Sequence, residues 1–183
     1  MSSTETDPPV PAGVEGETDN WGPARTKSIT YFDPGPSRAG RQGLSGLEYL
    51  QGIVAGRFPP PPIASLVDSR LVAVADGEAV FRCIPDAAFL NPLGLVHGGL
   101  LCTLMDSAMG VAVQTKLPAS TGAASIELKV SFLKPLPYDG SELEVRGRAL
   151  RVGRRVAFAE GHAYDPQGVL VGHATSSLSI LTG

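Results

Sequence analysis

Apolar positions recur along this chain first at a helical spacing and later at the spacing of β-strands. Four apolar residues near the start follow the helical spacing: Leu44, Leu47, Leu50 and Val54. Ser45 stands where a helix N-cap is expected, and the proline-rich run 59–62 ends the helix and predicts an extended connection. Two strands are predicted next, at 66–75 and 78–84, joined by Asp76-Gly77, a typical hairpin turn.

The segment 99–113 is a long apolar run rich in Leu, Met and Ala, which favours a helix over a strand. Four strand-like runs follow it, with turn-forming residues between them: 123–133, 142–151, 155–164 and 169–181. In the first of these runs, alternate positions form a predicted apolar face: Ala124, Ile126, Leu128, Val130 and Phe132. The order of elements predicts an α+β fold, in which an antiparallel sheet of about six strands wraps one long central helix.

The first part of the chain differs in composition from the rest. Residues 1–42 are rich in Pro, Gly, Ser, Thr and charge, and they contain few branched apolar residues. Such a segment buries too little apolar surface to offset its ordering entropy. We therefore expect a polar, flexible N-terminal extension at 1–42 and a single globular domain at 43–183.

The overall charge and the cysteine count narrow the class of protein. A net charge of −3 gives no support to nucleic-acid binding, and no stretch approaches the roughly 20 apolar residues of a membrane span. The polar N-terminus does not resemble a secretory signal. Cys83 and Cys102, the two cysteines, lie in apolar runs and are expected to be reduced thiols of a cytoplasmic protein, with a disulfide as the alternative.

Asp106 stands alone as an acidic residue in the middle of the apolar helix. At about 100° per residue, the face of Asp106 carries Gly99, Cys102, Thr103 and Gly110. The opposite face carries Leu101, Leu104, Ala108 and Val111. An unpaired carboxylate costs several kcal/mol to desolvate. Asp106 is therefore either a hydrogen-bonded structural residue or a functional carboxylate that a ligand can approach closely.

The residues just before this helix provide a second chemical feature. The run from Asn91 to Gly99 ends in His97-Gly98-Gly99, and the glycines let a ligand approach the backbone. The first N–H groups of a helix have no internal partner and lie at the positive end of its dipole. They can therefore stabilise a developing oxyanion.

The spacing Asn91-x5-His97-Gly98-Gly99-x6-Asp106 resembles the signature of the PaaI-like (phenylacetic-acid-pathway type) hotdog thioesterases. Further matches are Ser107-Ala108-x-Gly110, the run from Ile126 to Pro135, Gly153-Arg154-Arg155 and the run from Gly168 to Thr175. The resemblance covers the chain from about residue 44 onward. It implies a hotdog fold and the hydrolysis of an aryl- or fatty acyl-CoA to free acid and CoA, without a cofactor or metal.

The same resemblance implies a role for each site residue. Asp106 would act as general base or nucleophile, and the Gly98 N–H would polarise the thioester carbonyl. Asn91 would assist at the carbonyl or position water, His97 would order the loop, and Ser125 would orient the water or Asp106. The expected substrate-binding residues are Gly99, Thr103 and Gly110, with Lys134, Arg154 and Arg155 for the CoA phosphates.

Helix geometry adds one inference about assembly. Gly98 and Asp106 are eight residues apart, so one straight helix separates them by about 12 Å. An oxyanion donor and a nucleophile must both lie within roughly 3 Å of the reacting group. We therefore expect a homodimer, or a dimer of dimers, whose active sites combine Gly98 of one subunit with Asp106 of its partner.

The sequence disfavours several other functions and leaves two alternatives open. A Cys102 nucleophile with His97 is disfavoured, because a thiol in an apolar helix is usually inert. The chain lacks a G-x-S-x-G elbow, and His97, His162 and His173 lack metal-ligand spacing with the cysteines or carboxylates. A non-catalytic acyl-CoA-binding protein and a hotdog hydratase or dehydratase remain alternatives.

Overall fold

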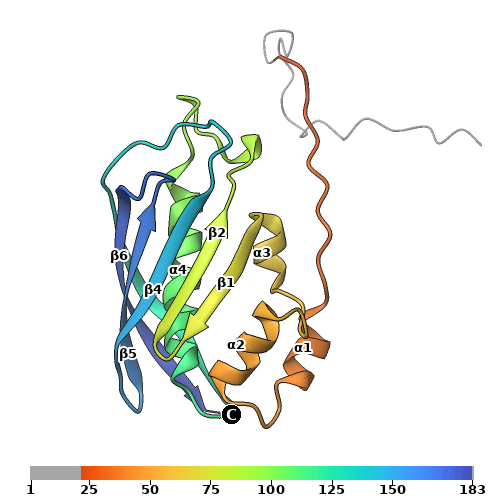
Figure 1. Ribbon diagram of the computed structural model, residues 1–183, viewed down its shortest axis with the longest axis vertical. Helices are drawn as coiled ribbons and strands as arrows, with labels where there is room; N and C mark the ends of the chain where they lie inside the picture. Colours follow the sequence, from red (N-terminus) through yellow and green to blue (C-terminus); the bar gives the residue numbers. More distant parts are fainter. Residues whose placement is uncertain (1–21, 183) are drawn as a thin grey trace, which may run out of the picture.

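The computed structural model describes residues 22–182, and in them one long helix is wrapped by a single antiparallel sheet (Figure 1). The helices are α1 (Pro34–Gly40), α2 (Gly46–Val54), α3 (Pro62–Leu66) and α4 (Gly98–Thr115), with a short 3-10 turn at Ala87–Phe89. The strands are β1 (Ser69–Ala75), β2 (Glu78–Cys83), β3 (Thr121–Phe132), β4 (Leu143–Val152), β5 (Val156–Tyr164) and β6 (Leu170–Thr182). Their order in the sheet is β1-β2-β4-β5-β6-β3, so the predicted hotdog architecture is confirmed.

Helix α4 forms the centre of the core. Leu104, Met105 and Met109 are almost completely buried against the inner face of the sheet. A Cβ atom at Gly147 of β4 would collide with the backbone of Ala108, so helix and sheet meet at van der Waals contact there. The sheet thereby fixes the rotation of α4 and the direction in which Asp106 points.

Strand β3 departs from the predicted alternation. A bulge between Ser125 and Glu127 inserts Ile126 as an extra residue. Before the bulge, odd-numbered residues face α4, and after it even-numbered ones do, because each insertion reverses the pleat. The predicted continuous apolar face is therefore wrong at Ala124 and at Ile126, which is 60% exposed. Ser125, predicted on the opposite face, turns toward the helix instead.

The segment before β1 contains more structure than its composition predicts. Helix α2 begins as expected, with a capping box between Ser45 and Glu48. The connection at 59–62 was expected to be extended, but it leads into α3, and β1 begins at Ser69 rather than residue 66. Short proline-rich segments carry too weak a periodic signal for such a helix to be predicted.

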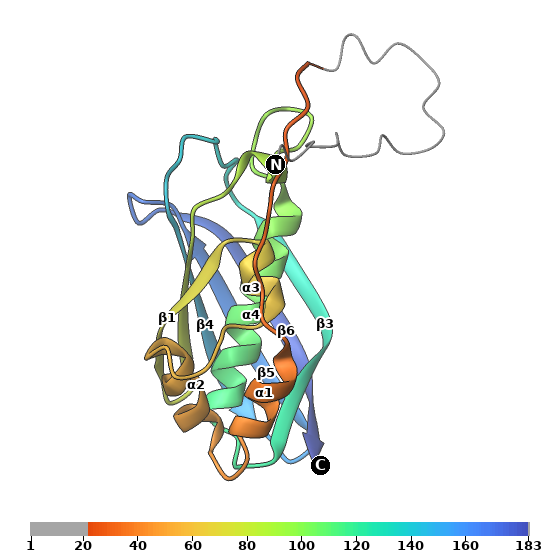
Figure 2. The same ribbon diagram turned by 90° about the vertical axis from the view of Figure 1, so that its right-hand side faces the viewer.

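Part of the expected N-terminal extension contacts the domain. Lys27 Nζ lies 2.7 Å from Asp68 and 3.1 Å from Asp86, and Ser37 of α1 hydrogen bonds to Tyr49 of α2. Figure 2 shows residues 22–33 running past α3 toward α1. The division at residue 42 remains a prediction, and its part at residues 1–21 lies outside the described residues.

Two further expectations concern the whole chain. Both Cys83 and Cys102 are free thiols in the fold. Among residues 22–182, no helix has the combined length and apolarity that a membrane crossing requires.

Candidate active site

The loop that leads into α4 is held by its own polar groups. The side-chain Oδ1 of Asn91 accepts hydrogen bonds from the backbone N–H groups of Leu93 (2.9 Å) and Leu95 (3.2 Å). That oxygen is committed to the loop, so the Nδ2 amide is the part of Asn91 left to contact a ligand. Asn91 therefore shapes the loop in addition to any direct role.

His97 is the N-cap of α4. Its Nδ1 accepts a hydrogen bond from the Gly99 N–H at 2.8 Å, and its own backbone N–H donates to Phe89. An Nδ1 that accepts a hydrogen bond is unprotonated, which puts the proton of a neutral imidazole on Nε2. The Gly98 N–H is the first of the helix and has no acceptor within the described part of the chain. The capping arrangement leaves this amide for a ligand.

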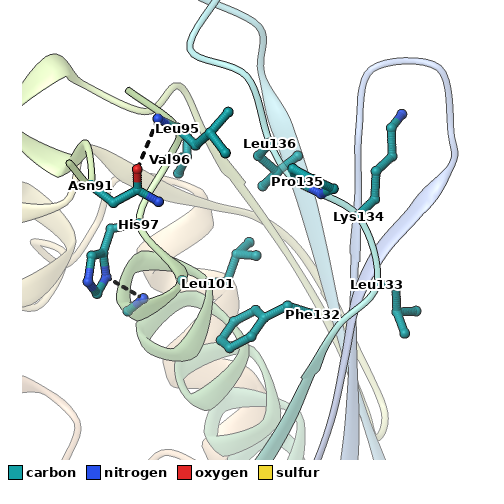
Figure 3. Close-up of a pocket in the computed structure, with 12 residues that line it drawn as sticks. Asn91, Leu95, Val96, His97, Leu101, Phe132, Leu133, Lys134, Pro135 and Leu136 are labelled. Atoms are coloured by element: carbon teal, nitrogen blue, oxygen red, sulfur yellow. Dashed lines mark hydrogen bonds between the residues drawn. The ribbon is translucent and has the colours of Figure 1, made fainter. Parts of the chain in front are cut away.

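A cavity of about 580 Å³ adjoins this helix start (Figure 3). Asn91, His97 and Gly98 line one side, and the other side is lined by Phe132 at the end of β3 and by residues 133–136 of the β3–β4 connection. A Cβ atom at Gly98 would lie 2.8 Å from Cζ of Phe132, so a larger residue there would require that ring to move. The cavity is large enough for part of an acyl-CoA.

Asp106 lies in a different cavity, farther along α4. The Ser125 hydroxyl donates to Asp106 Oδ1 at 2.6 Å, and both residues line a space of about 310 Å³. Ser107, Gly110 and Val111 of the helix also line it, with α3 on another side. Val111 also reaches this space, although a spacing of five residues places it about 140° around the helix from Asp106.

Asp106 is therefore a hydrogen-bonded, partly buried carboxylate beside open space. Asp106 differs from a structural aspartate of a protein core. Ser125 fixes one of its carboxylate oxygens, and the Asp106 side chain also lines a cavity. The hydroxyl orients the carboxylate without neutralising it. Such a group can accept a proton from water or attack a carbonyl.

The remaining expected substrate-binding residues fall into separate places. The Thr103 hydroxyl donates to the Gly99 carbonyl at 3.1 Å, within α4. Lys134 is among the residues that line the larger cavity, but its side chain points away from the start of α4 (Figure 3), and its Nζ pairs with Asp165 at 2.8 Å. Arg154 and Arg155 lie in the β4–β5 turn, at the end of the sheet away from the start of α4 (Figure 1). One chain therefore does not bring its candidate cations together.

The structure argues against a cysteine nucleophile. Burial raises the pKa of the Cys102 thiol, and it raises that of Cys83 to about 11. Both groups are therefore protonated near neutral pH, the unreactive form.

The other two histidines form a cluster that the sequence pattern does not predict. His162 of β5 and His173 of β6 are cross-strand neighbours with Glu160 beside them, on the sheet face that points away from α4. Burial, followed by the charge of His173, lowers the pKa of His162. The spacing Glu160-x-His162 places two of these side chains on one strand face, but only the register of β5 with β6 brings in the third.

The sequence profile of the thioesterase superfamily matches residues 93–171, a range that contains Gly98, Asp106 and Ser125. A Saccharolobus solfataricus protein named as a candidate esterase is 30% identical over 119 residues, covering 65% of this chain and 83% of that protein. Mouse acyl-coenzyme A thioesterase 13 is 28% identical over 111 residues, covering 60% of this chain and 78% of the mouse protein.

A solved structure gives the same assignment. It is that of a Ralstonia eutropha protein described as a candidate thioesterase related to phenylacetic acid degradation, with a TM-score of 0.66, 29% identity and coverage of 72% of this chain and 98% of that one. The chain spans about half the length of two other curated relatives, 52% and 48%. The chain thus belongs to the thioesterase superfamily, among its PaaI-like hotdog-fold members.

Proposed function

We propose that this protein is an acyl-CoA thioesterase that hydrolyses an aryl- or fatty acyl-CoA to the free acid and CoA. The observation that carries the proposal is the Ser125–Asp106 pair at 2.6 Å, on a helix whose first amide opens into a cavity. The acyl-coenzyme A thioesterase name of a relative supports the same substrate class. The two free thiols support a cytoplasmic location.

In the proposed reaction, the Gly98 N–H donates to the thioester carbonyl oxygen as it becomes an oxyanion. Asp106 either removes a proton from the water that attacks the carbonyl carbon or attacks that carbon itself. In the first route, the C–S bond breaks and the departing CoA thiolate takes the proton from Asp106. In the second route, C–S cleavage releases the thiolate and forms a mixed anhydride with Asp106, and water then hydrolyses the anhydride and supplies the proton that the thiolate takes up. Ser125 holds Asp106 in position, while Asn91 and His97 hold the loop before Gly98.

The proposal includes an active site shared between subunits. Gly98 and Asp106 lie on one uninterrupted helix, about 12 Å apart by its rise, and they line different cavities. A two-fold axis beside α4 would place the Gly98 cavity of one subunit against Asp106 of the other. Strand β3 has a free edge, and its exposed Ile126 and Phe132 would be covered in such a dimer or dimer of dimers.

The same pairing would explain the scattered cations. Lys134 of one subunit and Arg154 and Arg155 of another could then meet the phosphates of one CoA, although they are separated within a chain. We propose these three residues, with Thr103, Gly99 and Gly110 at the helix, as the substrate-contacting set.

Release of free thiol from a panel of aryl, short, medium and long acyl-CoAs tests the activity, without added metal or nucleotide. Turnover of at least one substrate, lost in Asp106→Asn, is expected. Tight binding of acyl-CoA without thiol release across the panel would favour the non-catalytic acyl-CoA-binding protein. A hydratase or dehydratase that used His97 and Asp106 would add or remove water on the acyl chain without releasing thiol, and analysis of the CoA products would distinguish it from simple binding.

A further inference from the structure

The outer face of the sheet carries a cluster of potential metal ligands. His162 of β5 and His173 of β6 are directly opposite each other in the antiparallel register, and their ring centroids are 4.9 Å apart. Glu160 lies two residues before His162, so its side chain leaves the same face of the strand. Two adjacent strands therefore present two imidazoles and one carboxylate to one point.

The geometry of the cluster suits a single ion. One nitrogen or oxygen from each of the three residues lies within 4.8 Å of the others, and all three residues are partly buried. Ligands at about 2.0–2.1 Å from a tetrahedral Zn²⁺ are about 3.3 Å apart. Small rotations of side chains that are already adjacent would close that difference. Two imidazoles with one carboxylate form a set that binds zinc and similar divalent transition metals.

Of the two arginines nearest the cluster, one is engaged elsewhere and one makes a loose contact with it. Arg146, which is opposite His162 on β4, pairs with Glu144 at 2.6 Å and covers the ring of Tyr164. Arg148 lies 3.5 Å from one carboxylate oxygen of Glu160, a loose contact that an ion would replace. On the other side of the cluster, His173 is opposite Ser131 of β3, which is uncharged.

We propose that Glu160, His162 and His173 bind one divalent transition-metal ion of the Zn²⁺ class, with water in the open coordination position. The site lies on the sheet face away from α4, so the ion would join β5 to β6 rather than take part in thioester hydrolysis. An ion that binds only the folded state stabilises that state by mass action. The proposal does not depend on the proposed enzymatic activity.

The test is a zinc titration of the full chain after treatment with a chelator. Free zinc is followed by a competing chromophoric chelator, and bound zinc is counted by elemental analysis. We expect one ion per chain and a melting temperature that rises with zinc concentration. His162→Gln and His173→Gln should each weaken binding by at least about 10–100-fold, the cost of disturbing even outer-shell partners. Glu160→Gln should weaken it less, since an amide oxygen can still coordinate.

The third histidine of the chain provides the matched control. His97 is outside the cluster, and His97→Gln should bind zinc with wild-type affinity. Histidine ring signals in the NMR spectrum of the wild-type chain give a readout that needs no variant. Stoichiometric zinc should shift two of the three sets and leave that of His97 unchanged. Equal affinity in wild type and the His162→Gln/His173→Gln double variant would overturn the proposal. So would saturation of the wild type only at millimolar zinc, with all three histidine signals shifting together.

Discussion

If the active site is shared, two inactive variants should restore each other's activity when their subunits exchange. The first is Asp106→Asn, which removes the carboxylate but keeps the size of the side chain and most of its contact with Ser125. The second is Asn91→Ala, which removes the oxygen that holds the backbone amides of Leu93 and Leu95. Each lost hydrogen bond costs about 1 kcal/mol, so the loop that presents the Gly98 amide should loosen.

The expected recovery follows from the geometry. After complete exchange of an equal mixture, half of the dimers are hybrids. If Asn91 and Gly98 act with the partner's Asp106, each hybrid has one doubly damaged site and one intact site. The mixture should then regain about one quarter of wild-type activity, measured as thiol release per chain. If both residues serve a site within one chain, no hybrid contains an intact site.

A mixture of wild type with the Asn91→Ala/Asp106→Asn double variant is the matched control, because it gives the reverse result. Every site of such a hybrid lacks either the ordered loop or the carboxylate. Activity should therefore fall from about half to about one quarter of the wild-type value as subunits exchange. Exchange itself is followed by mass spectrometry of isotopically labelled subunits. Activity that stays at half in the control, with no recovery in the first mixture despite complete exchange, would refute the shared site.

Three further predictions concern single features of the chain. Asp106→Asn should lower turnover by at least about 10²-fold, which corresponds to about 2.7 kcal/mol in activation free energy, and Ser125→Ala should lower turnover less. The circular dichroism spectrum of both variants should match that of the wild type. Wild-type rates in both variants would contradict the assignment of Asp106. Hydrogen bonds from Lys134 and the Val169 amide lower the pKa of Asp165. The ionised Asp165 therefore stabilises the folded state fully above the unfolded-state pKa of about 3.9, and this contribution is lost as pH falls through the lower pKa of the folded state. Chemical unfolding between pH 5 and 2 should therefore show a shallower acid loss in Asp165→Asn, and identical pH profiles would count against the pairing. Deletion of residues 1–40 should lower the melting temperature, because it removes the Lys27 ion pairs, while leaving the Asp106 cavity intact; an unchanged melting temperature would mean that those contacts contribute nothing.

Long periodic segments of this chain could be predicted from sequence, because burial leaves a strong pattern in them. The segment 99–113 was expected to be helical, and α4 spans Gly98–Thr115. The four later strands begin and end within two residues of their predicted bounds. In each case, the same residues that satisfy local propensity also bury apolar surface, so local and tertiary preferences agree.

The differences arise where tertiary contacts decide. The bulge at Ile126 is set by pairing with β6, and a regular apolar alternation gives no sign of it. Helices α1 and α3 are too short to be stable alone, and their proline-rich sequences show no helical periodicity from which they could be predicted. The contact between Ser125 and Asp106 depends on that bulge, because without it the pleat would turn Ser125 away from the helix. Both residues could be identified from the sequence, but the strand register that brings them into contact could not.

The two faces of the sheet allow the two proposals to be tested separately. Side chains of β5 alternate between the core under α4 and the outer face, so His162 and Glu160 point away from the helix that carries Asp106. Loss of an outer-face ligand changes no residue of either cavity along α4. A His173→Gln variant should therefore lose zinc affinity and keep its thioesterase rate, while Asp106→Asn should do the reverse. If both variants lost both properties together, a general loss of folding would explain the result better than either site.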